Sequence, residues 1–445
     1  MRGGWIAFGM LGCGGGVGDG DESGTDDVVP PAEVTTADCV VVDNPLVVEC
    51  SSELAAAGAV TLTLTADGLP TRTFTTVASG TEAALIGWGL RAETTYAWEV
   101  EGVTGTVVTG ALPPELGGLS VQTTGTLFGA DGVLVYVDCG WFLIVDSEGE
   151  VIWTAESEAF DRLSDGMMWS QPDRSLLTVR DSAMSNNESL FVEVGVAGDE
   201  RLRLLPGTDF SLALTHDVGR WGPYTYLLGE DTRVGGFEVW EGTEHLGTWL
   251  LSDAFSEVGD LEVAHVNGLT ASDEGEVVIS ALGFNAVLTV DGDPASPTFL
   301  QMLWHARGVS GGGGLPNPDF TPESGDVFER QHNASVHGDE LWVFDNGSAS
   351  SARAVRLSLD AGAGTLTELD AWPLNQQCMN QGGAMPLDGG VLATCANTGD
   401  VSAFRDGADT PEWTLHASCG GPGGPGGNMG GNMGGSTRAF PVQVQ

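Results

Sequence analysis

Residues 264–304 read AHVNGLTASDEGEVVISALGFNAVLTVDGDPASPTFLQMLW, and this stretch contains the pattern that decides the fold. Short runs of aliphatic and β-branched residues alternate with glycine-containing acidic turns such as 272–275, and a tryptophan closes the stretch. Runs of this length between such turns are typical of antiparallel strands. A sheet of four short strands cannot bury its faces alone, so the pattern predicts packing against further copies.

The same pattern recurs through the rest of the chain. Units begin near residues 126, 167, 215, 264, 331 and 380, and the candidate closing tryptophans are Trp153, Trp249, Trp304, Trp372 and Trp413. Six repeated sheets predict a six-bladed β-propeller over residues 120–445. Within it we expect a Gly-rich loop over 419–435 and a last strand that closes the ring.

Residues 33–115 have a separate strand pattern. Alternating runs at 59–64 and 72–77 predict a small β-sandwich. The segment 90–100, LRAETTYAWEV, places a leucine a few residues ahead of a Tyr-x-Trp-x-Val strand. It resembles the tyrosine-corner end of fibronectin III and immunoglobulin-like domains. The predicted fold class is therefore all-β, with this domain ahead of the propeller.

The charge balance excludes several classes of partner. Of the 445 residues, 62 are acidic and 16 are basic, and all the basic ones are arginine, which gives a formal net charge of −46. Nucleic acid is not expected as a partner because binding phosphates needs clustered cations. The absence of Cys/His pairs with ligand spacing, and of nucleotide-binding motifs, predicts neither a metal site nor a cofactor.

The N-terminus resembles a bacterial lipoprotein signal. Residues 1–13 contain one arginine, a short apolar run over 5–11, and a glycine before Cys13, which would carry the lipid. The run is too short to span a bilayer. Residues 14–32 have the composition of a flexible acidic tether. We therefore expect a lipoprotein of the bacterial cell envelope, periplasmic or on the surface, that meets the membrane only through its anchor; the oligomeric state is left open.

Six cysteines remain after Cys13, an even number that favours disulfides in an oxidising compartment. Cys39 and Cys50 are close enough in sequence to pair locally, as are Cys378 and Cys395. This leaves Cys139 and Cys419, although spacing alone does not establish the connectivity.

Three of the seven histidines occupy the same place in successive units. They are His216, His265 and His332, each at the start of a unit. The first strand of a propeller blade lines the axial channel, so these imidazoles are predicted to point toward one axis. One such histidine is usually a hydrogen-bonded core residue, but three in phase favour a functional site.

The sequence around these histidines resembles the bacterial aryl-sulfate sulfotransferases (arylsulfotransferases, ASST). The most specific stretches are 265–269 leading to 278–285, and 328–334 leading to 344–347, followed by Arg353. The resemblance covers about residues 35–445 in order. It implies an immunoglobulin-like domain before a six-bladed propeller. It also implies ping-pong transfer of a sulfuryl group from a phenolic sulfate ester to a phenol, through a sulfated histidine and without a nucleotide donor.

The resemblance also implies roles for individual residues. A transferring sulfuryl group carries negative charge on three equatorial oxygens, so positioned cations supply most of the stabilisation. We expect the guanidinium group of Arg353 to donate hydrogen bonds to two of those oxygens at once. His265 and His332 are expected to stabilise charge or to donate a proton to the leaving phenolate. The expected substrate-binding residues are His216, Asn267 and Asn333.

The resemblance fails at the nucleophile. The family's nucleophilic histidine lies in the last blade, where the matching position here is Ser402. A serine without an adjacent base is a poor substitute. His416 is the nearby candidate, although it follows Trp413 and is expected on an outer strand. The alternatives are an active sulfotransferase, an inactive propeller that binds a ligand or protein at its axial channel, and a surface spacer.

Overall fold

The computed structural model describes residues 30–156, 166–180, 189–205, 209–231, 233–309, 315–347, 352–378, 381–396, 398–419 and 438–444. Cys13, the tether up to residue 29 and nearly all of the 419–435 loop lie outside these residues. The regular secondary structure of the described chain is almost entirely β-strand, which confirms the all-β prediction. Its helical segments are η1 (Pro114–Leu116), α1 (Leu251–Ala254), η2 (Leu261–Ala264) and η3 (Leu282–Phe284). None of the helices described is long and apolar enough to cross a membrane.

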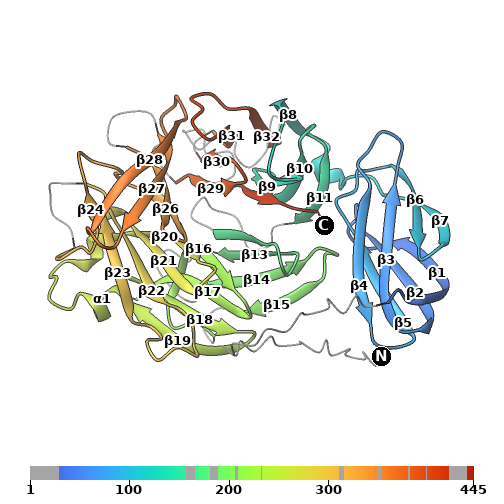
Figure 1. Ribbon diagram of the computed structural model, residues 1–445, viewed down its shortest axis with the longest axis horizontal. Helices are drawn as coiled ribbons and strands as arrows, with labels where there is room; N and C mark the ends of the chain where they lie inside the picture. Colours follow the sequence, from blue (N-terminus) through green and yellow to red (C-terminus); the bar gives the residue numbers. More distant parts are fainter. Residues whose placement is uncertain are drawn as a thin grey trace, which may run out of the picture.

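The N-terminal unit consists of two antiparallel sheets, seen on the right of Figure 1. One sheet has the order β1-β2-β5, with β1 (Glu33–Val41), β2 (Val48–Ala56) and β5 (Glu82–Gly87). The other has the order β4-β3-β6-β7, with β3 (Gly58–Thr65), β4 (Arg72–Ala78), β6 (Thr95–Val100) and β7 (Val103–Val108).

Strand alternation builds the core of this unit. Val60, Leu62 and Leu64 are buried on one face of β3 and share a hydrophobic cluster with Leu85 of β5, because successive side chains of a strand point to opposite faces. The Tyr96 hydroxyl accepts a hydrogen bond from the backbone N–H of Arg91 at 3.0 Å. This is the contact expected of a tyrosine corner.

Six further sheets follow one another along the chain (Figure 1), and their strands are antiparallel apart from one short parallel pairing at the edge of the fifth sheet. The first contains β9 (Gly132–Val137), β10 (Trp141–Asp146), β11 (Val151–Glu156) and the C-terminal β33 (Phe440–Val442). The second contains β12 (Gly166–Ser170), β13 (Ser175–Arg180), β14 (Leu190–Gly195) and β15 (Glu200–Leu204). The third contains β16 (Ala213–Trp221), β17 (Tyr224–Asp231), β18 (Val234–Glu241) and β19 (Glu244–Leu250).

The remaining three sheets follow the same order. The fourth contains β20 (Val266–Ala271), β21 (Glu276–Ala281), β22 (Ala286–Asp291) and β23 (Met302–Arg307). The fifth contains β25 (His332–His337), β26 (Glu340–Asp345), β27 (Arg353–Asp360), β28 (Thr365–Pro373) and, at its edge, β24 (Thr321–Pro322). The sixth contains β29 (Gly383–Leu387), β30 (Gly390–Cys395), β31 (Asp400–Arg405), β32 (Trp413–Cys419) and, at its edge, β8 (Leu119–Gly125).

The inner strands of these sheets contact one another in a closed sequence. β33 contacts β12, and contacts then run through β16, β20, β25 and β29 back to β33. The C-terminal strand completes the first sheet by pairing with β9, with Phe440 opposite Leu134. Each candidate closing tryptophan lies on the outermost or next-to-outermost strand of its sheet: Trp153 on β11, Trp249 on β19, Trp304 on β23, Trp372 on β28 and Trp413 on β32.

The prediction of disulfides is confirmed. Cys39–Cys50 links β1 to β2, and Cys378–Cys395 fastens the segment before β29 to β30. Cys139–Cys419 joins the first of the six sheets to the last. The third bond and the C-terminal strand therefore both tie the end of the chain to the first sheet.

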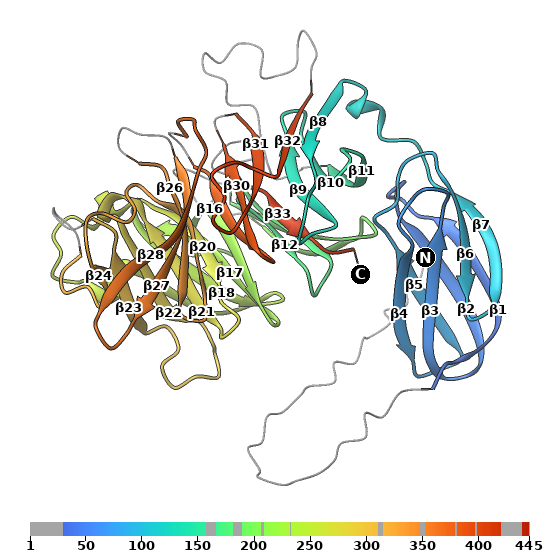
Figure 2. The ribbon, with the colours of Figure 1, turned by 45° about the horizontal axis from the view of Figure 1, so that its top comes forward.

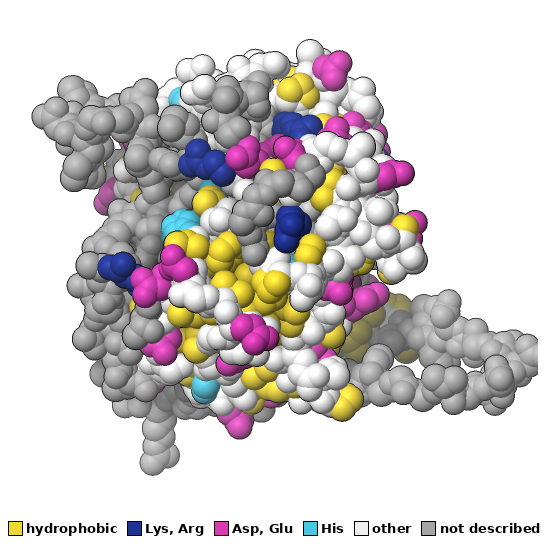
Figure 3. All heavy atoms as spheres, turned by 90° about the vertical axis from the view of Figure 1, so that its left-hand side faces the viewer, with side chains coloured by type: hydrophobic (Ala, Val, Ile, Leu, Met, Phe, Trp, Pro, Cys, Tyr) yellow, Lys and Arg dark blue, Asp and Glu magenta, His cyan; other side chains and the backbone are white. Residues whose placement is uncertain are grey.

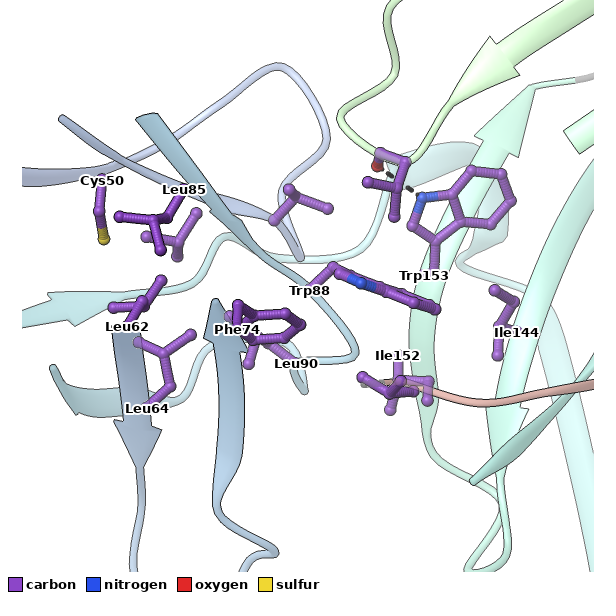
Figure 4. Close-up of a cluster of buried hydrophobic side chains, with 14 of the residues drawn as sticks. Cys50, Leu62, Leu64, Phe74, Leu85, Trp88, Leu90, Ile144, Ile152 and Trp153 are labelled. Carbon is purple, nitrogen blue, oxygen red and sulfur yellow. Dashed lines mark hydrogen bonds between the residues drawn. The ribbon is translucent and has the colours of Figure 1, made fainter. Parts of the chain in front are cut away.

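The N-terminal unit is packed against the first two sheets. Trp88 is fully buried, and its ring lies 5.5 Å from that of Trp169. Trp169 lies 5.5 Å from Trp153, so the three rings form one cluster between the units. Figure 4 shows two of them, Trp88 and Trp153, among the buried side chains around them. The C-terminus ends on the side of the ring that faces the N-terminal unit (Figure 2). There, a side chain at Gly89 would collide with Val444.

Candidate functional site

The three in-phase histidines lie at the same end of neighbouring inner strands. His216 is in β16, His265 directly precedes β20, and His332 begins β25. The strand pairing is irregular at each of these places. His216 and His265 have φ values of 52° and 44°, in the left-handed region that residues other than glycine rarely adopt. Such strain clusters at functional sites, so its recurrence marks this end of the ring as a candidate site.

His216 and His265 form a pair. Their ring centroids lie 5.5 Å apart and the rings are perpendicular. Nδ1 of His216 contacts the hydroxyl of Thr215. His216 is half-buried and His265 is exposed. The structure therefore brings together two of the predicted histidines, one of them open to solvent.

His332 is buried and held by an amide. Its Nδ1 lies 2.7 Å from Oδ1 of Asn346. Burial lowers the pKa of His332 to about 3, and the positive charges of His216 and Arg438 act in the same direction, whereas hydrogen bonding to Asn346 and the Arg330 backbone opposes the shift. The imidazole is therefore neutral at neutral pH.

An ion pair crosses the ring beside these histidines. Arg438, just before β33, pairs with Asp217 of β16, and the two side chains are only 7% and 0% exposed. Asp217 also accepts backbone hydrogen bonds from Leu269 at 2.5 Å and Val218 at 3.0 Å. Burial raises the pKa of Asp217, while Arg438 and the two N–H groups oppose the rise. Because Arg438 lowers the pKa of His332, its positive charge reaches the histidine cluster.

Sequence reasoning did not identify Arg438, Asp217 or Asn346. One signal for Asp217 was its position directly after an in-phase histidine. Arg438 is the one arginine after residue 405, but nothing local connects it to the histidines. Asn346 follows β26, whose Phe344 pairs with His332.

Asn267 and Asn333, predicted to bind substrate, connect neighbouring inner strands. The side-chain amide of Asn267 donates to the carbonyl of Gln331 at 3.0 Å, and Oδ1 of Asn333 accepts from the backbone N–H of Ala384 at 3.0 Å. Oδ1 of Asn267 and Nδ2 of Asn333 are buried and find no hydrogen-bond partner within the described chain. Unpaired buried polar atoms are rare in proteins. Because both atoms are closed off from solvent in this structure, the substrate-binding role of Asn267 and Asn333 stays a prediction.

Arg353 is placed two strands outward from His332. It begins β27, the third strand of its sheet. Its Nε donates to Asp345 at 2.9 Å, and its two terminal nitrogens donate to Glu368 at 2.9 Å and to the carbonyl of Val327 at 3.0 Å. Each guanidinium nitrogen thus has a protein partner. The role of Arg353 in holding sulfuryl oxygens stays a prediction.

His416 and Ser402 are not on an inner strand either. His416 lies on β32, and its Nδ1 is 2.9 Å from Oδ1 of Asp400. Its side chain is 45% exposed. Ser402 lies on β31, opposite Ala393 and Thr414. The structure therefore groups His216, His265 and His332 but brings neither of these candidate nucleophiles to the inner strands.

The arrangement combines a neutral buried imidazole, two further imidazoles and a buried guanidinium. Such groups can bind an anion, donate protons and supply a nitrogen lone pair. No group of three or more side chains suited to holding a metal ion occurs in the described part of the chain. The described side chains at this end of the ring thus offer imidazole, guanidinium and amide groups, together with the carboxylate of Asp217 and the hydroxyl of Thr215.

Comparisons with known proteins do not identify a family. No family model matches the chain, and no curated protein matches it. A chain of a nidogen/laminin complex is 13% identical over 64% of this chain and 97% of its own, with a TM-score of 0.41. Virginiamycin B lyase from Staphylococcus aureus is 10% identical over 80% of this chain and 93% of its own, with a TM-score of 0.37. A functionally unknown protein from Desulfotomaculum acetoxidans is 10% identical over 70% of this chain and 98% of its own, with a TM-score of 0.43. TM-scores below 0.5 support no inference about this chain.

Proposed function

We propose that the six sheets are the blades of a six-bladed β-propeller and that the N-terminal unit is an immunoglobulin-like β-sandwich. Three observations support the propeller: the closed sequence of inner-strand contacts, the completion of the first sheet by β33, and the tryptophans toward the outer edges of five sheets. The hydrogen bond between Tyr96 and Arg91 supports the sandwich. In this arrangement the histidine cluster lies at one mouth of the axial channel.

The function that this site supports best is transfer of a sulfuryl group from a phenolic sulfate ester to a phenol, without a nucleotide donor. The observation that carries the proposal is the convergence of His216, His265 and His332 from three neighbouring inner strands, within reach of the charge of Arg438. Negative charge on the sulfuryl oxygens needs positioned cations. A phenolate leaving group needs a proton donor that titrates near neutrality.

The local charge matters because the whole chain is strongly acidic. Acidic side chains are scattered over the face of the molecule seen in Figure 3. With a formal net charge of −46, the protein repels an anionic ester at long range. Arg438 lies beside the histidines but shares its charge with Asp217, so in this proposal His216 and His265, when protonated, supply positive charge that offsets the repulsion inside the channel.

The proposed location is the bacterial cell envelope, with a lipid on Cys13. The sequence before Cys13 and the three disulfides support it, since disulfides persist in oxidising compartments. In that setting the donor and acceptor phenols are small molecules that reach the protein from outside the cytoplasm.

A propeller that binds a ligand without turnover is the second candidate function. The position of Ser402 on β31 favours it, as does the pairing of His416 of β32 with Asp400 of β31, because the last sheet then supplies no histidine to the cluster. Such a protein would bind a sulfate ester and release no phenol.

Release of p-nitrophenol from p-nitrophenyl sulfate, with a phenolic acceptor present, tests the proposal. We expect release by the wild type, loss in His332→Ala, and retention in His416→Ala and in a control, His337→Ala, at the opposite end of β25. Loss in Arg353→Ala as well would support its predicted role. Loss in His416→Ala would make that residue the nucleophile. No release by the wild type, together with measurable binding, would favour the binding protein.

A further inference from the structure

The orientation of the Asn346 side chain is determined by its neighbours. Its amide nitrogen lies within hydrogen-bonding distance of two backbone carbonyls, those of Cys378 and of Gln381, the latter at 2.9 Å. Carbonyl oxygens only accept hydrogen bonds, so this atom must be the NH₂ group. The atom that faces His332 is therefore the amide oxygen, at 2.7 Å from Nδ1.

This orientation selects the tautomer of His332. Because the amide oxygen can only accept, Nδ1 of His332 carries the proton. Burial of the ring keeps the imidazole neutral, since it lowers the pKa to about 3, and the nearby positive charges of His216 and Arg438 add to the effect. In a neutral imidazole only one nitrogen is protonated. Nε2 is then the ring nitrogen that carries a lone pair at neutral pH.

A lone pair at Nε2 does not suit the proton-donating role that the sequence suggested for His332. It suits a nucleophile, because activation of a weak nucleophile requires an unprotonated atom held in place. His216 and His265 remain as proton donors, and His265 is open to solvent. The missing histidine of the last sheet thus has a substitute on β25.

We infer that His332 is the residue that becomes sulfated, through Nε2, and that Asn346 is the positioning residue that keeps this nitrogen unprotonated. The inference rests on the proposed sulfuryl transfer. It differs from the pattern of the resembling family, which uses a histidine of the last blade, and from the displaced nucleophile His416.

The two half-reactions balance without a further reagent. In the first, the Nε2 lone pair forms a bond to sulfur while the bond from sulfur to the aryl oxygen breaks, and its electron pair leaves on the phenolate. The phenolate takes a proton from His216 or His265. In the second, the oxygen of the acceptor phenol bonds to sulfur, its proton passes to the same imidazole, and the N–S electron pair returns to Nε2. Nδ1–H stays hydrogen-bonded to Asn346 throughout.

The first experiment uses the intact wild-type chain with p-nitrophenyl sulfate and no acceptor. We expect one p-nitrophenol released per chain, a gain in mass of one SO₃ group, and its location on His332 by peptide mapping. Mapping to His216, His265 or His416 would overturn the assignment while leaving sulfuryl transfer intact. Turnover with acceptor but no labelled chain would also overturn it, because transfer would then be direct. No release under any condition would overturn both the assignment and the proposed function.

The second experiment tests Asn346 without relying on activity. Nitrogen NMR of the wild-type chain labelled in histidine should show His332 neutral at pH 5, with the proton on Nδ1. A proton on Nε2, or titration of His332 near the ordinary histidine range, would overturn the positioning role.

Two variants extend this test. Asn346→Leu removes the acceptor that fixes the tautomer of His332, and we expect labelling to slow by at least about tenfold. Asn346→Asp keeps an acceptor for Nδ1–H but adds a negative charge, which raises the pKa of His332. Labelling should persist, but the pH below which its rate falls should be higher than in the wild type. The His337→Ala chain should label like the wild type. Equal rates and pH profiles in all these chains, with unchanged thermal unfolding, would overturn the positioning role.

Discussion

Replacing Arg438 by methionine should destabilise the protein strongly, because it leaves a buried carboxylate without its cation. Asp217 is 0% exposed and Arg438 is 7% exposed, so solvent does not screen the pair. Breaking a buried ion pair from one side costs about 3 to 5 kcal/mol. Asp217 keeps the hydrogen bonds from Leu269 and Val218, which places the expected loss near the lower end, at about 3 kcal/mol.

The rescue and the control follow from the same reasoning. Adding Asp217→Asn to Arg438→Met removes the unpaired charge and keeps a carbonyl oxygen for the Leu269 N–H, so most of the loss should be recovered. Arg233→Met is the matched control. Its pair with Glu262 spans 3.8 Å between side chains that are 73% and 57% exposed. An exposed pair of this kind contributes about 0 to 1 kcal/mol.

Urea unfolding followed by tryptophan fluorescence measures these differences. Lowering the pH should reduce the difference in free energy of unfolding between the wild type and Arg438→Met. Burial raises the folded-state pKa of Asp217, and removing Arg438 raises it further. Stability is therefore recovered as the pH falls through that pKa. A loss below about 1 kcal/mol, or no rescue by Asp217→Asn, would refute the reasoning.

Three other substitutions test separate parts of the structure. Trp88→Ala should lower the free energy of unfolding by about 3 to 5 kcal/mol, since the ring is fully buried between the two units. The control Val108→Ala, at a side chain that is 57% exposed, should change it by less than about 0.5 kcal/mol. Equal effects of the two substitutions in thermal melts would contradict this. The pKa of His332 is lower in the folded chain than in the unfolded chain, so acid favours unfolding. Between about pH 6 and pH 4 the free energy of unfolding of the wild type should fall by about 1.4 kcal/mol per pH unit relative to that of His332→Gln. Parallel plots of unfolding free energy against pH for the two chains would disprove the burial of a neutral ring. Replacing both Cys378 and Cys395 by serine should slow phenol release, because the backbone carbonyl of Cys378 accepts a hydrogen bond from Asn346. Unchanged release from a folded chain would show that this disulfide does not help to position Asn346.

Local signals in the sequence predicted much of the fold. The alternation in β3 and the tyrosine-corner segment involve neighbouring residues, so Tyr96 and its partner Arg91 are recognisable without tertiary information. The closing tryptophans recur once per repeat and lie on the outer strands of their sheets. The cysteine pairs Cys39–Cys50 and Cys378–Cys395 follow from short spacing.

The candidate site was predicted in part. The histidines were found because each occupies the same place in its own repeat. Arg438 and Asp217 were not found, because their contact depends on how the C-terminal segment enters the closed ring. Arg353 was expected at the anion, but Asp345, Glu368 and a backbone carbonyl surround its guanidinium, and those contacts depend on the register of β26, β27 and β28.

A crystal structure of the protein soaked with p-nitrophenyl sulfate, without an acceptor, tests the central claim most directly. The account predicts a sulfuryl group among His216, His265 and His332, either as the bound ester or bonded to Nε2 of His332. A sulfuryl group beside His416 on β32, or full occupancy at any place away from the inner strands, would contradict it.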